Sequence, residues 1–303
     1  MEATKPVQPQ AKPQAQPKAQ KPQAAKKNVK GIKNAFLVII VCFCVAVCLF
    51  LFVFGAPGHF APDSLIADNG ELLTPKWTVW GIDKAHPVDL IGTIFKGGII
   101  VPVLQTLLLT VIVLSVERWI ALSSAKGKGN TAKFVANVKG CLAKNDIAGA
   151  QALCKKQKGS VAAVVAAALI RYEEMDKNTV LSKEQKIATL QKEVEEATAL
   201  EMPALQQNLP IVATMTTLGT LVGLLGTVIG MIKSFQALSQ SGAPDSTALS
   251  TGISEALVNT AFGIATGAFA VISYNFYTNK IDNLTYAIDE IGFSIVQTFA
   301  ATH

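Results

Sequence analysis

The sequence has little of what soluble proteins and enzymes usually depend on. Charged residues make up only 16% of the 303 residues and aromatic residues 7%, whereas half of the chain is apolar and the mean hydropathy is +0.38. The three histidines are scattered, and we find no paired-histidine spacing and no nucleophile with a neighbouring base. These gaps argue against an enzyme, a catalytic residue, a metal site or a bound cofactor.

The five cysteines do not form a disulfide framework. Cys42, Cys44 and Cys48 lie within one apolar run, and Cys141 and Cys154 lie in a stretch that we place in the cytoplasm. Thiols stay reduced in that compartment, and no CxxC pair suggests a metal or redox site. We expect all five to be ordinary structural cysteines.

Long apolar runs, by contrast, are abundant. Four runs reach the length of about 20 mostly apolar residues that a helix needs to cross a bilayer. The sequence therefore predicts an all-α, polytopic membrane protein with four transmembrane helices and a cytoplasmic helical domain. The predicted spans are residues 35–54, 97–122, 209–235 and 251–276.

The net charge of +6 is unevenly distributed. Residues 1–34 hold eight lysines and one glutamate, residues 55–90 hold five acids against two lysines, and residues 117–207 hold fourteen basic and ten acidic residues. This alternation follows the positive-inside rule and favours cytoplasmic N- and C-termini. No arginine-rich or aromatic-interleaved surface suggests nucleic acid.

The same alternation assigns the segments between the spans. We predict a disordered basic cytoplasmic tail, two periplasmic loops, a cytoplasmic helical domain and a cytoplasmic C-terminal helix. Their residue ranges are, in that order, 1–34, 55–96 and 236–250, 123–208, and 277–303. Glu117, Arg118 and Trp119 close the second span and suggest an interfacial anchor, with a salt bridge left open.

Several local signals predict helices in the cytoplasmic part. Ser182 begins a capping box before a helix that we expect to run on into the third span, bent by Pro203 and Pro210. Asp146 and Ser160 are expected to cap two further helices.

The residues after the last span predict one more helix, with an apolar side suited to helix packing within an assembly. The residues of that apolar side are Ile281, Leu284, Ile288 and Ile291 or Phe293.

Small residues follow one face of each of the last two spans. Such a face lets helix backbones approach closely inside a membrane, where the hydrophobic effect does not drive association. The packing glycines are Gly219, Gly223, Gly226 and Gly230 in the third span, and Gly263 and Gly267 in the fourth.

Polar groups also lie inside these two spans. Thr227 is roughly 7 Å and Thr260 roughly 5 Å outward from the middle of its span, so both hydroxyls lie at about one level. A single threonine can bond to the carbonyl one turn back, which makes it a weak signal. Glu255 costs about 2.5–3.5 kcal/mol at the bilayer centre. It therefore either faces a wet interior or lies near the outer end beside water or Lys233.

Two motifs in these spans resemble the MotA/TolQ/ExbB proton-channel family, and the ExbB/TolQ branch most closely. The first is GLLGTVIGMIKSF at 223–235, and the second is GISEALVNTAFG at 252–263, followed by Tyr274-Asn275. The resemblance covers roughly residues 97–285. It implies a proton-channel subunit in the bacterial inner membrane, in which Thr227 and Thr260 line a pore and Glu255 is the motif carboxylate.

The resemblance also implies partners. It suggests a homopentameric ring around a dimer of an ExbD- or TolR-like single-span protein that carries an essential aspartate. A TonB-like protein would pass the work to outer-membrane transporters. Three alternatives stay open: a TolQ- or MotA-like motor with another output, a passive scaffold for an ion-carrying partner, and sodium in place of the proton.

This chain departs from the family pattern in four respects. The first span and the basic tail are additional, and Thr220 and Phe269 occupy positions where many members have proline.

Overall fold

The computed structural model of the protein describes residues 34–66, 78–79, 86–240 and 246–302. Nearly all of the predicted basic tail lies outside these residues. The described part is built from α-helices, and four helical stretches are long and apolar enough to cross a membrane. The prediction of an all-α chain with four candidate spans is therefore confirmed.

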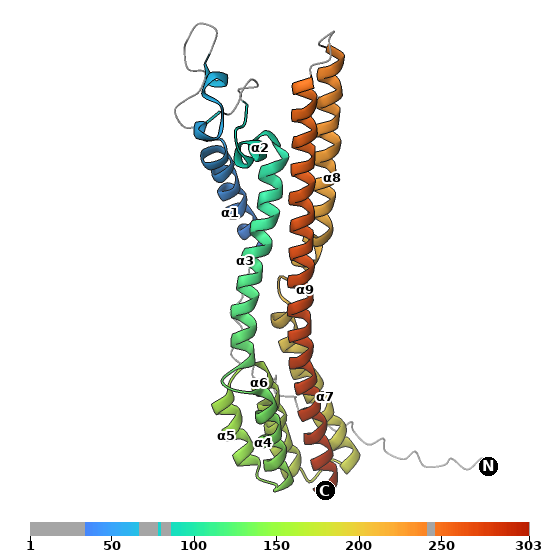
Figure 1. The fold of residues 1–303 in the computed structure, drawn as a ribbon. Helices are drawn as coiled ribbons and strands as arrows, with labels where there is room; N and C mark the ends of the chain where they lie inside the picture. The colour runs from blue at the N-terminus through green and yellow to red at the C-terminus, as the bar shows by residue number, and fades with distance from the viewer. Residues whose placement is uncertain (1–33, 67–77, 80–85, 241–245, 303) are drawn as a thin grey trace, which may run out of the picture.

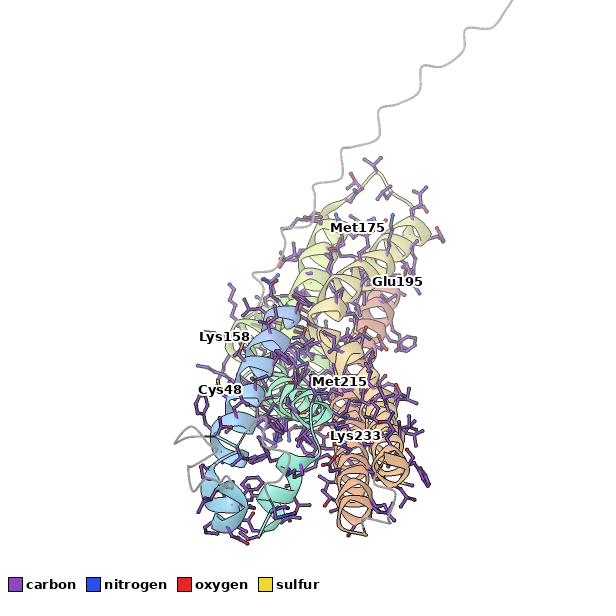
Figure 2. All side chains as sticks on the ribbon, turned by 90° about the horizontal axis from the view of Figure 1, so that it is seen from above. Cys48, Lys158, Met175, Glu195, Met215 and Lys233 are labelled. Carbon is purple, nitrogen blue, oxygen red and sulfur yellow. The ribbon has the colours of Figure 1, made fainter. Side chains whose placement is uncertain are left out.

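The first two candidate spans pack against each other. Helix α1 (Ala35–Cys48) continues as a π-helical turn (Leu49–Phe54) and lies beside α3 (Ile100–Lys126). The segment between them, predicted as a loop, contains helix α2 (Leu90–Lys96) and the short 3-10 helices Pro57–His59 and Pro62–Leu65. Figure 2 shows Cys48 on the outer side of α1, where its side chain is exposed.

The other two candidate spans form a long antiparallel pair. Helix α8 (Leu209–Gln240) runs beside the first half of α9 (Ser246–Thr302), as Figure 1 shows. Both helices extend into the predicted 236–250 loop. Helix α9 continues for 57 residues without a break at residue 276, so the predicted fourth span and C-terminal helix are one element.

A bundle of shorter helices surrounds the second half of α9 and the end of α3 (Figure 1). Its helices are α4 (Thr131–Ala143), α5 (Ile147–Gln157), α6 (Ser160–Lys177) and α7 (Lys183–Gln206). Four predicted positions on α9, Ile281, Leu284, Ile288 and Ile291, are buried in its core. Phe293 is 69% exposed, because it lies two residues, or about 200° of helical turn, after Ile291.

Two of the three predicted helix caps are confirmed. The Gln185 amide donates to Ser182 Oγ (3.3 Å) and the Ser182 amide to Gln185 Oε1 (3.1 Å), and Asp146 Oδ1 accepts from the Gly149 amide (2.8 Å). The expectation for Ser160 is wrong. The cap of α6 is Gly159, whose φ of 88° favours glycine, and Ser160 is the first helical residue.

The predicted continuous helix from 182 into the third span is also wrong. Helix α7 ends at Gln206 and α8 begins at Leu209, with Asn208 between them at a φ of 64°. Pro210 cannot donate a backbone hydrogen bond to the preceding turn, so a continuous helix would lose a bond there. Asparagine tolerates the left-handed conformation that separates the helices.

A buried ion pair joins α3 to this break. The Arg118 guanidinium is 0% exposed and bonds both carboxylate oxygens of Glu117, at 2.5 and 2.7 Å. It also donates to the carbonyl of Leu205 (3.2 Å), while the side-chain Nδ2 of Asn208 donates to Glu117 Oε2 (3.4 Å). The salt bridge that the sequence left open is therefore present, and it links helices inside the protein.

Burial gives one testable consequence in the bundle. It raises the pKa of the Cys154 thiol to about 12, so the thiol stays protonated near neutral pH. With Cys154 as the only cysteine, maleimide labelling at about pH 8 should be at least about tenfold slower than with Cys141 as the only cysteine, because the thiolate is the reactive form. Cys141 is only partly buried. Equal native-state rates would contradict the burial, and denaturant should remove the difference.

Candidate functional site

The glycine faces of α8 and α9 meet within one chain. A Cβ atom at Gly223 would lie 2.9 Å from the Cα atom of Gly263, and one at Gly226 would lie 2.5 Å from the Cβ atom of Asn259. Gly230 faces Ala256 in the same way, at 2.9 Å. The two backbones therefore approach so closely that no side chain fits between them, as small residues allow.

The two predicted pore threonines lie on the same side of this pair. A Cβ atom at Gly267 would lie 2.8 Å from Thr220 Oγ1. Thr227 follows Thr220 by seven residues, and Thr260 precedes Gly267 by seven. Seven residues are nearly two full turns, and the helices are antiparallel, so Thr227 and Thr260 repeat this juxtaposition at the next level.

The hydroxyls of these threonines differ in their partners. Thr227 Oγ1 donates to the carbonyl of Leu224 at 2.6 Å and keeps its lone pairs free to accept. Thr260 Oγ1 is buried and has no hydrogen-bond partner among the described residues. A buried hydroxyl without a partner is costly, so this position suits a water molecule or a passing ion.

A cavity continues along the same side toward the bundle. Its volume is about 400 Å³, and Tyr274 and Ile281 in its wall continue the seven-residue steps from Thr260 through Gly267. Asp282 also lines it, and the hydroxyl of Thr278 is buried there without a described partner. Sequence reasoning missed this cavity, because it opens only where α7 and α8 separate.

Glu255 lies on the other side of the pair. Its carboxylate is 4.0 Å from Lys233 Nζ, and its side chain is only 14% exposed. A Cβ atom at Gly98 would lie 3.5 Å from the same ammonium, so the turn between α2 and α3 packs here. The structure therefore brings Thr227 and Thr260 together and places Glu255 with Lys233, one of the two surroundings considered above. Figure 2 labels Lys233 on α8.

This placement can be tested by a pair of substitutions. Lys233→Met should lower the melting temperature of the purified protein, because it leaves the largely buried Glu255 carboxylate without its counter-charge. The double variant Glu255→Gln/Lys233→Met should be the more stable of the two. A thermal melt that shows the double variant to be no better than Lys233→Met would contradict the pairing.

Asn259 is a residue to which sequence reasoning assigned no role. Its Nδ2 donates to the carbonyl of Gly97 at 3.2 Å, and its side chain is buried against Gly226. It thus ties α9 to the C-terminal end of α2 and to α8 at once. An amide inside an apolar run was the available signal, but its partner is distant in sequence.

The fold and this site define a multi-span helical membrane protein with a polar stripe between two closely packed helices. Residues 156–290 match the MotA/TolQ/ExbB proton channel family. This segment, which holds both motifs, belongs to that family, as the motifs predicted.

Three relatives illustrate the match. An ExbB-like biopolymer transport protein of Synechocystis is 37% identical over 93 residues, covering 29% of this chain and 44% of the relative. The Tol-Pal system protein TolQ of Haemophilus influenzae is 36% identical over 75 residues (25% and 33%). The biopolymer transport protein ExbB of Salmonella typhimurium is 30% identical over 84 residues (28% and 34%). The alignments thus span a third to under a half of these relatives. With the four apolar helices they indicate an inner-membrane protein.

Proposed function

We propose that this chain is the proton-channel, or stator, subunit of an inner-membrane motor that uses the proton motive force to energise TonB-dependent outer-membrane transport. One observation carries the proposal. Thr227 and Thr260 share one level and one side of the α8–α9 pair, and the Thr260 hydroxyl is buried there without a described partner. The names of the relatives, biopolymer transport protein ExbB among them, supply the transport function.

The proton carrier is proposed to come from a partner. Glu255 faces Lys233 rather than the threonines, and Asp282 lines the cavity only toward the bundle, so a carboxylate at the level of the threonines would come from elsewhere. A homopentamer whose threonine sides face inward would surround a dimer of an ExbD- or TolR-like single-span protein, and the aspartate of that protein would supply this carboxylate. A TonB-like protein would then receive the motion.

The surface of α8 fits such an assembly. Leu221, Leu224, Leu225 and Val228 are more than half exposed in the single chain, which suits contact with lipid or with neighbouring subunits. Both termini and the α4–α7 bundle are proposed to lie in the cytoplasm, following the charge distribution. One proton that crosses 100 mV releases about 2.3 kcal/mol, so a few protons suffice for a conformational step.

The test is proton-driven uptake of a TonB-dependent cargo in cells that lack their own ExbB-type subunit and carry this chain with its partner. The double variant Thr227→Val/Thr260→Val should lose most uptake at an unchanged protein level in the membrane. Normal uptake would contradict the pathway. A loss that merely follows reduced assembly would support the scaffold alternative instead.

The process that the motor drives and the ion that drives it are tested in separate experiments. The TolQ relatives favour a Tol-Pal role as the second candidate. Restored outer-membrane integrity in cells that lack TolQ, without restored uptake in cells that lack ExbB, would select it. Uptake that depends on sodium at a fixed membrane potential would replace the proton as the driving ion.

A further inference from the structure

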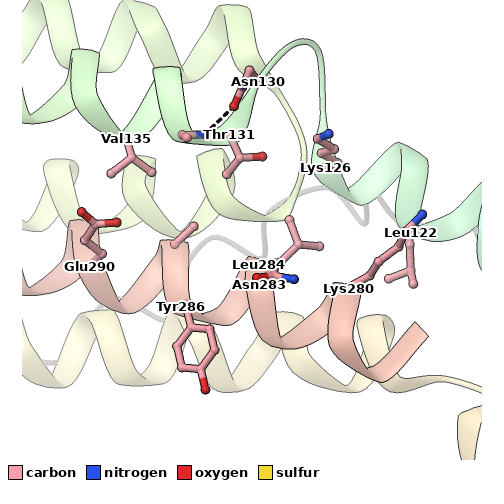
Figure 3. A pocket seen from close by; sticks show the side chains of 12 residues that line it. Leu122, Lys126, Asn130, Thr131, Val135, Lys280, Asn283, Leu284, Tyr286 and Glu290 are labelled. Carbon is pink, nitrogen blue, oxygen red and sulfur yellow. Dashed lines mark hydrogen bonds between the residues drawn. The ribbon is translucent and has the colours of Figure 1, made fainter. Parts of the chain in front are cut away.

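A second cavity lies well away from the threonines, where α3 leads into α4 and both face α9 (Figure 3). Its volume is about 470 Å³, large enough for the polar headgroup of a lipid. Figure 3 shows Lys126 and Lys280 at one end and Glu290 at the other. Apolar side chains, Leu122 and Leu284 among them, form part of the wall.

The lysine end of this cavity is positive. Glu290 at the far end is neutralised by Lys139, whose Nζ lies 2.6 Å from its carboxylate. Among the described residues, neither Lys126 nor Lys280 forms an ion pair. Two ammonium groups therefore face the cavity without a counter-charge from the described chain, and an anion would balance them.

The lysine end also lies at the edge of the apolar surface. Lys280 Nζ is 4.2 Å from the ring centre of Trp119 and 4.3 Å from that of Phe276, and the two rings are stacked. Trp119 is 53% exposed, and Ile120 beside it is exposed too. Exposed tryptophan beside lysine is typical of the level at which lipid headgroups lie.

Neutral polar groups complete the wall. The Asn130 side chain accepts from the Ala132 amide at 2.9 Å and caps α4. The hydroxyl of Thr131 is buried and has no hydrogen-bond partner among the described residues. Phosphate oxygens in the cavity can accept from this hydroxyl and from Lys126, with the charge of Lys280 at the same end, and such charge-assisted bonds are the strong ones.

We propose that this cavity binds the phosphate of an anionic phospholipid, with its headgroup against Lys126, Lys280 and Thr131 and its acyl chains along Trp119 and Phe276. Basic pockets between transmembrane helices bind anionic headgroups in this way. The proposal goes beyond ion conduction and does not depend on it.

The test uses Trp119 as the reporter. The chain has three tryptophans, so Trp77→Phe/Trp80→Phe leaves Trp119 alone. The full-length protein is reconstituted into vesicles, and quenching by brominated phosphatidylglycerol is compared with quenching by brominated phosphatidylcholine. The affinity for phosphatidylglycerol should be at least about five times the affinity for phosphatidylcholine. One lysine near an anionic surface contributes a factor of about that size. We call the quotient of the two affinities the ratio.

Matched variants distinguish binding at this cavity from a general effect of the protein's charge. Lys126→Gln/Lys280→Gln should bring the ratio close to one, whereas Lys155→Gln/Lys156→Gln on α5 makes the same change of charge and should leave it unchanged. If the first variant does not fold, the single change Lys126→Glu, at an exposed residue, should still lower the ratio.

Four results would overturn the proposal. The first two are a ratio near one in the parent protein and a ratio that neither Lys126→Gln/Lys280→Gln nor Lys126→Glu changes. The other two are an equal fall of the ratio in the α5 control and removal of the preference for phosphatidylglycerol by excess inorganic phosphate. The last would identify free phosphate as the ligand.

Discussion

Replacing Gly226 with alanine should destabilise the protein by about 1–3 kcal/mol, although alanine is the better helix former. The new methyl group would lie 2.5 Å from the Cβ atom of Asn259, so α8 and α9 would have to separate. That separation would also pull Asn259 away from Gly97. We expect a lower melting temperature in detergent, followed by far-UV circular dichroism.

Gly140 offers a matched control. It lies in α4 and is exposed, and a Cβ atom there would meet nothing within 4 Å. Gly140→Ala should therefore raise stability by up to about 1 kcal/mol, through helix propensity alone. Replacing glycine with alanine should therefore lower stability at Gly226 and raise it at Gly140. A stabilising Gly226→Ala would show that the helices are not packed through their glycine faces.

The substitution Arg118→Met should cost about 3–5 kcal/mol, because it leaves Glu117 buried without its counter-charge. It also removes the donor to the Leu205 carbonyl at the end of α7. We expect the α7–α8 junction to loosen, and limited proteolysis near Asn208 should report this as earlier cleavage.

Two comparisons make this prediction specific. The double variant Glu117→Gln/Arg118→Met should be closer to the parent than Arg118→Met alone, because it leaves no unpaired charge. Lys192→Met breaks an exposed pair, with Glu196 at 3.6 Å, and should change stability by less than about 1 kcal/mol. An Arg118→Met effect as small as that of Lys192→Met would contradict the burial of the pair.

The helical architecture could be predicted because its signals are local. Apolar runs of spanning length gave the candidate spans, and the capping patterns at Asp146 and Ser182 gave two helix starts. Both depend on residues within a few positions of each other. The break between α7 and α8 was missed because Pro210 allows either a bend or a stop, and the outcome depends on the left-handed conformation of Asn208.

The site was predictable only in part. Depth along each predicted span placed the two threonines at about one level, but it did not show which helix faces meet. That depends on the antiparallel register, which the contacts of Gly223 with Gly263 and of Gly267 with Thr220 define. The same register turns Glu255 toward Lys233 and buries Asn259 beside Gly97. Contacts between residues so distant in sequence leave no local pattern.

Proton flux through the reconstituted complex tests the central claim most directly. Vesicles that contain this chain with its ExbD- or TolR-like partner and an internal pH-sensitive dye would receive an imposed membrane potential. The control is Thr214→Val, thirteen residues before Thr227 and on the opposite side of α8, where the hydroxyl bonds the Pro210 carbonyl. We expect parental flux from the control and background flux from Thr227→Val/Thr260→Val. Undiminished flux from that double variant would contradict a proton path between α8 and α9.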